Sequence, residues 1–172
     1  MMRTIETARL TLEPQLAAHA PAMFVVLSDP AIYRLENAPP ATLEWLRQRY
    51  AALELRRSPD GCEQWLNWVL RLRSGGLIGF VQATIDADGR AFIAYELGSA
   101  RWGQGLAREA VQAMIGELAS QYAVHTLHAA FKRANDRSRR LLERLGFVPT
   151  KSQSTAADED LMTLSLTTFA GT

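Results

Sequence analysis

A pair of glycines placed between a strand and a helix marks the position in this chain best suited to hold an anion. Trp102-Gly103-Gln104-Gly105-Leu106-Ala107 precedes a periodic helical stretch, with Arg101 before it and Arg108 after it. Glycine lets the backbone approach a ligand closely, and the unpaired N–H groups at a helix N-terminus favour a phosphate. The spacing predicts a phosphate-binding turn, although a tight connection that needs glycine for shape alone would show the same pattern.

The glycine pattern does not fit two well-known phosphate loops. No Gly-Lys-Ser/Thr follows the glycines, as a nucleoside-triphosphate loop requires, and the third glycine of a dinucleotide fingerprint is missing. Both of those loops also follow a strand of a parallel sheet, whereas the strand expected here belongs to an antiparallel meander.

A second polar pair lies at the start of the next expected helix. Asn135 and Ser138 have the residue types of an N-cap and a first-turn residue, which is also the simplest explanation for each. The strands expected at Ala91–Leu97 and Val124–Phe131 end side by side, so the glycine turn follows one and the Asn135 helix follows the other. A ligand could lie in the gap with its phosphates on Gly103–Ala107 and its tail at Asn135 and Ser138.

Alternating and helical periods predict the elements of the first half. Thr4–Glu13 alternates as a half-buried strand, Pro21 suits the first turn of a helix, and Thr42 suits the N-cap of another. Short turns then separate three strand patterns, which lie at Leu66–Leu72, Leu77–Ile85 and Ala91–Leu97. Strands joined by such short loops form an antiparallel meander.

The second half contains the strongest helical pattern. Apolar residues recur at helical spacing over Ala107–Ala119, between the strands Ala91–Leu97 and Val124–Phe131, and this order implies a parallel crossover. A helix from Asn135 closes at Gly146. Phe147–Lys151 and Leu161–Leu166 are expected to form a hairpin around the loop Ser152–Asp160. The prediction is an α+β fold with a mixed, mostly antiparallel sheet flanked by helices.

Length and composition limit the class of protein. The 172 residues suit a single domain, 1–172, and 48% hydrophobic with 22% charged residues is ordinary globular usage. A net charge of +1 gives no basic field for nucleic acid, and Cys62 alone supports neither a disulfide nor a zinc framework. Met1–Glu6 lacks the apolar core of a signal peptide, and no run reaches the ~20 apolar residues of a membrane span. We expect a cytoplasmic protein that binds neither nucleic acid nor membranes.

These motifs together resemble the GNAT N-acetyltransferases, and within them the branch of the RimJ- and RimL-type ribosomal-protein acetyltransferases. The resemblance covers nearly the whole chain. Its motifs occur in the family's order: Thr7-Ala8-Arg9-Leu10-Thr11-Leu12, Leu77-Ile78-Gly79-Phe80, Trp102–Ala107 with Glu109-Ala110, and Asn135-x-x-Ser138 through Leu145-Gly146-Phe147.

The resemblance implies a sheet that splays at its centre and binds acetyl-CoA as co-substrate, without a metal. Pantetheine would use main-chain groups from Leu97 to Ser99, and Ser138 would lie near the sulfur. The implied cofactor-binding residues are Leu97, Ser99, Trp102, Gly103, Gln104, Gly105, Leu106, Ala107, Asn135 and Ser138. Trp102 replaces the usual Arg or Gln of the phosphate loop, and Leu142 replaces the tyrosine that many members use to protonate the leaving thiolate.

Acetyl transfer from a thioester to an amine needs a neutral, aligned amine and a stabilised oxyanion. Because a free alkylamine has a pKa near ~10, a general base helps at neutral pH. Glu96 is the carboxylate nearest the expected split, unless it is a solvated residue on an exposed strand face. A main-chain N–H near Leu97 could serve the oxyanion. Ser138 could bond to the departing sulfur, or the thiolate could leave unprotonated, since its pKa is near ~8.5. Glu96 and Ser138 are the expected catalytic residues.

The acceptor is expected to enter beside the early helices and the strand Trp65–Leu72. Tyr33, Glu36 and Trp68 are the expected substrate residues, although tryptophans on a strand commonly pack in the core. Six basic side chains could contact the CoA 3′-phosphate or form a solvated helix face. They are Lys132, Arg133, Arg137, Arg139, Arg140 and Arg144.

The sequence predicts an acetyl-CoA-dependent N-acetyltransferase whose partner is an amine acceptor, either a protein N-terminus or a small molecule. A homodimer is left open. Two alternatives remain at this point. One is a non-catalytic acyl-CoA-binding sensor or interaction module on the same fold, and the other is a protein that binds the phosphates of another nucleotide.

Overall fold

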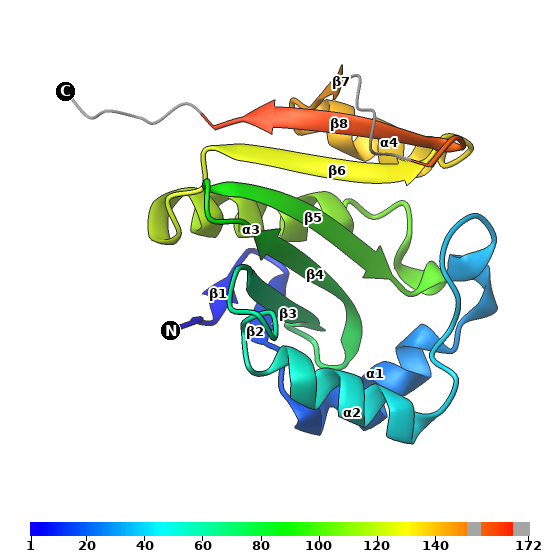
Figure 1. Ribbon diagram of the computed structural model, residues 1–172. Coiled ribbons are helices and arrows are strands. Elements are labelled where there is room, and N and C mark those ends of the chain that lie inside the picture. Colours follow the sequence, from blue (N-terminus) through cyan, green and yellow to red (C-terminus); the bar gives the residue numbers. More distant parts are fainter. Residues whose placement is uncertain (151–155, 167–172) are drawn as a thin grey trace.

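The computed structural model describes residues 1–150 and 156–166, and it is built on one eight-stranded sheet with the order β1-β2-β3-β4-β5-β6-β8-β7 (Figure 1). The helices are α1 (Ala20–Leu27), α2 (Leu43–Leu53), α3 (Leu106–Gln121) and α4 (Asp136–Arg144). The strands are β1 (Ile5–Glu6), β2 (Leu10–Pro14), β3 (Gln64–Leu72), β4 (Leu77–Ile85), β5 (Arg90–Leu97), β6 (Thr126–Lys132), β7 (Val148–Thr150) and β8 (Glu159–Ser165). The expected α+β architecture is confirmed.

The first half of the sheet is the antiparallel meander that the short turns predict. β2, β3, β4 and β5 pair in sequence order, each antiparallel to the next. The single strand expected at Thr4–Glu13 is wrong: β1 and β2 form a hairpin instead. The chain turns there because Thr7 Oγ1 accepts a hydrogen bond from the Leu10 N–H at 2.9 Å, while the Thr7 N–H donates to the Leu10 carbonyl.

Helices cover both faces of the sheet and give the molecule two hydrophobic clusters. α3 packs on one face with a cluster that includes Leu106, Met114 and Leu118. α1 and α2 pack on the other face, where Val69 of β3 joins their apolar side chains. Thr42 caps α2 as expected, since its Oγ1 accepts from the Trp45 N–H at 3.0 Å.

The sheet splits where β5 and β6 part. These two strands are parallel but pair only over Arg90–Phe92 of β5, and beyond that point they diverge (Figure 1). β6 stays paired with β8 along its whole length, and β5 stays paired with β4 as far as Leu97. The Gly98 N–H donates to the Ile78 carbonyl of β4, so the alternation of an antiparallel ladder turns the main-chain groups of Tyr95 and Leu97 toward the split. The splay expected at the centre of the sheet is confirmed.

The remaining elements border the split on the β6 side. Asn135 caps α4 by accepting from the Ser138 N–H at 3.1 Å, and Gly146 ends the helix with a φ of 91°. The expected terminal hairpin is present as antiparallel β7 and β8, with β8 between β6 and β7. The first part of the loop expected at Ser152–Asp160 lies outside the described residues.

Gly79 is a position where the close pairing of β4 and β5 requires glycine. A Cβ added there would overlap the main-chain carbonyl oxygen of Glu96 and lie 2.9 Å from the Leu97 Cα. We predict that Gly79→Ala lowers the free energy of unfolding by about 1–3 kcal/mol, because the backbone of β5 must move. Urea denaturation would measure the change.

Gly116 of α3 supplies the matched control for this substitution. A Cβ there meets no atom within 4 Å, so Gly116→Ala should raise the free energy of unfolding by about 0.5–1 kcal/mol through helix propensity. Equal stability of Gly79→Ala and the unsubstituted protein would show that β5 tolerates displacement at the split.

Candidate active site

A cavity of about 830 Å³ lies at the split of the sheet. Ile93–Leu97 of β5 and Ala129–Phe131 of β6 form its two walls, and it extends to the glycine turn, to α4 and to the early helices. Most of the site residues expected from the sequence line it. They are Tyr33, Glu36, Glu96, Leu97, Trp102, Gly103, Gly105, Leu106, Ala107, Asn135 and Ser138.

The glycine turn presents the N-terminus of α3 to one end of this cavity. Gly103 and Gly105 have φ values of 73° and 76°, in the left-handed region where residues with a Cβ are strained. A Cβ on Gly103 would meet no atom within 4 Å, so its backbone angle and not crowding calls for glycine. Gly105 is the N-cap of α3 and supplies no side-chain cap, which leaves first-turn N–H groups for an anion.

Arginines gather at the same end, and the structure separates the basic side chains that the sequence could not. Lys132 pairs with Asp158, while Arg133 and Arg139 both pair with Asp160. Arg101 and Arg108 lie beside the glycine turn, and α4 adds Arg137, Arg140 and Arg144 to the cavity lining. This end is therefore suited to a ligand with several negative charges.

Trp102, which replaces the usual residue of the phosphate loop, joins the glycine turn to β5 and to α4. Its indole Nε1 donates to the Leu97 carbonyl at 2.9 Å. The Arg137 guanidinium carbon of α4 lies 3.3 Å from the centre of a Trp102 ring, as a cation–π pair. Trp102 thus fixes the end of β5 and holds a cation beside the turn.

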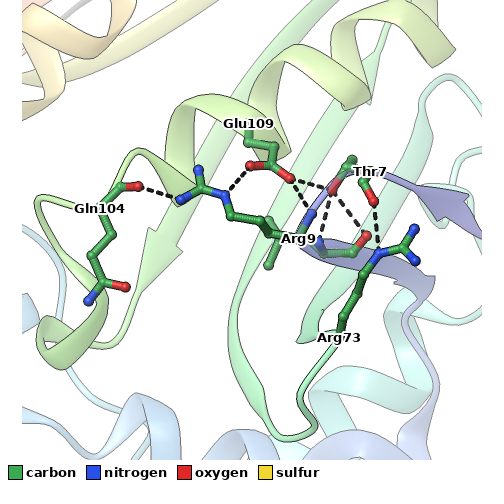
Figure 2. Close-up of polar contacts among 6 residues, drawn as sticks. Thr7, Arg9, Arg73, Gln104 and Glu109 are labelled. Atoms are coloured by element: carbon green, nitrogen blue, oxygen red, sulfur yellow. Dashed lines mark hydrogen bonds and ion pairs between the residues drawn. The ribbon is translucent and has the colours of Figure 1, made fainter.

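The N-terminal hairpin supports the glycine turn from behind (Figure 2). Arg9 Nη1 donates to the Gln104 carbonyl at 2.7 Å, and Arg9 Nε donates to Glu109 Oε2 at 2.7 Å. Glu109 Oε1 accepts from the Thr7 hydroxyl at 2.7 Å and from the Arg9 N–H at 2.8 Å. Arg73 of the same group donates to the Thr7 carbonyl and does not touch the turn. Arg9 and Glu109 therefore connect the hairpin, the turn and α3.

Glu96 is a half-buried carboxylate of β5 that also lines the cavity. Burial raises its pKa to about 7, against a hydrogen bond from the Leu97 N–H at 3.2 Å that favours the charged form. Arg137 lowers this pKa, while the carboxylates of Glu36 and Asp29 raise it. A group that titrates near neutral pH is suited to accept a proton from an amine. The Leu97 N–H, expected for the oxyanion, donates to Glu96 here.

Tyr95 is a residue of the site that the sequence reasoning missed. Its hydroxyl lies 2.7 Å from Ser138 Oγ, and both residues line the cavity. Tyr95 precedes Glu96 on β5, so the alternation of a strand directs their side chains to opposite faces. The sequence analysis could have found Tyr95 from this alternation, because it places Tyr95 next to Glu96 near the end of the strand that borders the expected split. Leu142, at the usual tyrosine position, is fully buried.

Two of the three expected substrate residues lie in the cavity with their polar groups already engaged. The Tyr33 hydroxyl donates to the Leu27 carbonyl at 2.6 Å. Glu36 Oε1 accepts from the Lys132 N–H at 2.6 Å and from Asn135 Nδ2 at 3.1 Å, so it ties the segment before α2 to the start of α4. The third residue, Trp68, is wrong, because it is fully buried in the core and its indole donates to the Arg3 carbonyl.

Two expected cofactor contacts also need correction. The Ser99 N–H and hydroxyl both donate to Asp29 Oδ2, at 2.8 and 2.5 Å, and the Ser99 carbonyl accepts from the Trp102 N–H. Ser99 thus anchors the segment after α1, and its N–H is already engaged by Asp29. Gln104 does not line the cavity, and its side chain donates to the Ala100 carbonyl at 3.2 Å.

The half of the cavity beyond Glu96 lies between the early helices and the sheet. Aromatic side chains, one amide and one arginine line it, and the sequence reasoning proposed none of them as site residues: Trp45, Arg49, Tyr50, Phe80 and Gln82. They come from two elements that only the folded chain brings together, α2 and β4.

Other reactive side chains lie away from this cavity. Cys62 is exposed, His125 contacts the Asp88 carbonyl, and His128 contacts the Thr163 hydroxyl. Within residues 1–150 and 156–166, no cluster of three or more His, Cys, Asp or Glu side chains is arranged to hold a metal ion. No helix in the same two ranges has the length and apolarity needed to cross a membrane.

Comparison with known families matches residues 9–148 to the family described as Acetyltransferase (GNAT) domain. A curated relative, the uncharacterized N-acetyltransferase p20 of Bacillus licheniformis, is 30% identical over 149 residues, which are 85% of this chain and 83% of that protein. The chain belongs to the GNAT acetyltransferase family. The resemblance inferred from the glycine turn and the Asn135 helix, and the class of enzyme it implies, are confirmed.

Solved structures show the same fold at low sequence identity. The ribosomal L7/L12 α-N-protein acetyltransferase RimL, in complex with coenzyme A, is similar with a TM-score of 0.83 and 16% identity, over 95% of this chain and 98% of that one. The microcin C7 self-immunity acetyltransferase MccE, in complex with acetyl-CoA and AMP, has a TM-score of 0.79 and 15% identity, over 93% and 94%. At these identities the likeness concerns the fold, which suits different acceptors.

Direct titration tests the electrostatics of the site. We predict that the side-chain carboxyl of Glu96, followed by carbon NMR, titrates with a midpoint near pH 7 in the free protein, because burial disfavours its charged form. The same spectra of Glu96→Gln identify the resonance by its loss. A midpoint near the ordinary ~4.3 of a glutamate would mean that this carboxyl is solvated.

Proposed function

We propose that this enzyme transfers acetyl from acetyl-CoA directly to a primary amine. One observation carries the proposal: a single cavity joins an anion-binding helix N-terminus to a carboxylate that titrates near pH 7, through the open split between β5 and β6. A donor with a polyanionic end and a thioester end fits such a cavity, and an amine can meet the thioester beside Glu96.

The described residues suit coenzyme A at each part of the cavity. The amides of Gly103 and Gly105–Ala107 and the neighbouring arginines would hold the pyrophosphate. The main-chain groups of Tyr95 that face the split would pair with the pantetheine amides, as a neighbouring strand does. Asn135 and Ser138 would lie along the opposite wall. Among the arginines of α4, Arg137, Arg140 and Arg144 are the candidates for the 3′-phosphate.

Glu96 would act as the general base, directly or through a water. Most of an alkylamine is protonated at neutral pH, and removal of that proton frees the lone pair for attack on the thioester carbonyl. A carboxylate with a pKa of about 7 is basic enough to accept the proton of the amine, and near neutral pH it can release that proton to solvent again. Asp29 and Glu36 add negative charge nearby, which favours an approaching cation.

The acceptor would occupy the half of the cavity lined by α2 and β4. Aromatic rings of Trp45, Tyr50 and Phe80 and the amide of Gln82 offer apolar contact, cation–π contact and hydrogen bonds. RimL acts on a ribosomal protein and MccE confers immunity to a microcin, so we propose a protein N-terminus or a small amine as the acceptor.

The test has two arms. Calorimetry with acetyl-CoA should give a dissociation constant in the micromolar range, and release of free CoA should rise when the right member of a panel of N-terminal peptides and small amines is added. Absence of binding at high concentration would refute the proposal. Binding without release across the panel would favour the alternative, a non-catalytic acyl-CoA sensor. Competition by ATP but not by CoA would favour another nucleotide.

Substitution of the proposed base gives a second prediction. Glu96→Gln should lower kcat about 10²-fold or more and leave the affinity for CoA nearly unchanged, because the lost group acts on the amine. In the unsubstituted enzyme kcat/KM should rise with pH through about 7, where the Glu96 carboxylate forms, and this limb should be absent in Glu96→Gln. A similar loss of kcat and of CoA affinity would remove Glu96 from the role.

The contact of Arg9 with the glycine turn predicts that substitution of Arg9 weakens the binding of CoA. Arg9→Gln should weaken CoA binding roughly ten-fold, because the turn loses the guanidinium that holds the Gln104 carbonyl. Arg73→Gln is the matched control, since Arg73 contacts Thr7 and Glu6 but not the turn, and its CoA affinity should stay within about two-fold. Equal affinities of the two variants would argue against a supporting role for Arg9.

A further inference from the structure

We propose that Tyr95 is a positioning residue whose hydroxyl donates to Ser138 Oγ and so aims the Ser138 hydroxyl hydrogen at the thiolate that leaves during acetyl transfer. This inference rests on the proposed function and goes beyond it, because it assigns the stabilisation of the leaving group to a pair of hydroxyls. The leaving thiolate needs such a donor because this chain has the buried Leu142 at the position where the resemblance places the usual tyrosine.

The pair spans the split of the sheet. Tyr95 belongs to β5 and Ser138 to the first turn of α4, and the 2.7 Å between their oxygens is a short hydrogen bond. The only other contact of the Tyr95 hydroxyl among the described hydrogen bonds is the Ser138 carbonyl, at 3.5 Å. Tyr95 therefore reaches across the cavity to this one residue of α4.

Either hydroxyl can donate in this pair, and the proposal assigns the donor role to Tyr95. Burial raises the pKa of Tyr95 to about 12, so its phenol stays protonated at any pH at which the enzyme works and remains a donor. A serine hydroxyl has one hydrogen and two lone pairs. When Ser138 accepts from Tyr95, its own hydrogen is free for a third atom in the cavity.

Stabilisation of the thiolate by a hydrogen bond suits this pair better than protonation. The thiol of CoA has a pKa near ~8.5, well below that of the Tyr95 phenol, so proton transfer from the phenol would be uphill. A hydrogen bond from a neutral donor to an anion is about twice as strong as one between neutral groups. Donation by Ser138, strengthened by Tyr95, lowers the energy of the departing thiolate without loss of a proton.

The complete step balances. The amine nitrogen forms a bond to the acetyl carbon, the carbon–sulfur bond breaks, and its electron pair leaves on sulfur. The ammonium form loses its first proton to Glu96 before attack, and Glu96 releases that proton to solvent. After attack the nitrogen carries one proton in excess, and this second proton passes to Glu96, directly or through a water. The thiolate departs with the Ser138 hydrogen bond and takes its proton from solvent. Tyr95 and Glu96 are adjacent in β5 with side chains on opposite faces, so one strand serves the leaving group and the amine separately.

The thiol pKa of bound CoA tests the proposal without any acceptor. All proteins carry Cys62→Ala, which removes the only cysteine and lies outside the cavity. Thiolate absorbance against pH is recorded for CoA complexes of this protein and of its Tyr95→Phe, Ser138→Ala and Tyr122→Phe variants. We expect a bound thiol pKa below ~8.5, a rise of about half a unit or more in Tyr95→Phe and in Ser138→Ala, and none in Tyr122→Phe, whose hydroxyl lies outside the cavity.

A double-mutant cycle gives the kinetic counterpart. Tyr95→Phe alone should lower kcat roughly ten-fold with little change in the KM for acetyl-CoA, because a hydrogen bond to a charged group is lost in the transition state. In the Ser138→Ala background the same change should cost less than about two-fold, since Tyr95 acts through Ser138. Melting temperatures check that each variant is folded.

The outcomes separate this inference from the proposed function. If CoA does not bind, the proposed function fails and the inference with it. If CoA binds and its thiol pKa is the same in Tyr95→Phe as in the parent, the inference fails while acetyl transfer stands. Equal kinetic costs of Tyr95→Phe with and without Ser138 would also overturn it, because they would indicate packing and not positioning.

Discussion

The early end of pairing between β5 and β6 is the constraint on which the rest of this structure depends. The two parallel strands share hydrogen bonds only as far as Phe92, while each keeps its other neighbour. The main-chain groups of Tyr95 consequently face a gap, and unpaired polar backbone in a protein interior calls for a partner. Those of Leu97 face the same gap but already pair with the side chains of Glu96 and Trp102. The crossover through α3 places a helix N-terminus at the mouth of that gap. A site for an extended, polyanionic donor follows from the backbone before any side chain is considered.

Charged side chains of both signs line the cavity. Arginines come from both sides of the glycine turn and from α4, and the carboxylates of Glu96 and Glu36 come from β5 and the segment before α2. Burial raises the pKa of Glu96 to about 7, and a general base that works at neutral pH needs a pKa in this range. Hydrogen bonds from distant segments keep this arrangement in place. Arg9 of the N-terminal hairpin donates to the Gln104 carbonyl of the glycine turn, and Asp29 accepts from the Ser99 N–H.

Local patterns were enough to predict most elements, and most of the residues expected to bind the acetyl donor line the cavity. Caps at Thr42 and Asn135 and the period of α3 are properties of neighbouring residues, so the sequence carries them directly. The acceptor half depends on which residues distant segments bring together, and there the prediction failed at Trp68, whose alternation in β3 does not reveal that both faces of that strand are covered. The same reason explains why Tyr95 was missed: its partner lies 43 positions away.

The most direct test of the central claim is an amide NMR titration of the isotope-labelled protein with CoA. The account predicts that the amides of Gly103–Ala107 and of Ile93–Leu97 shift together with one binding curve, and that those of β1 and β7 stay unchanged. Those two segments form the helix N-terminus and the open edge of β5 that the donor must occupy at once. Shifts confined to other segments, or saturation of the glycine turn without any change along β5, would contradict the account.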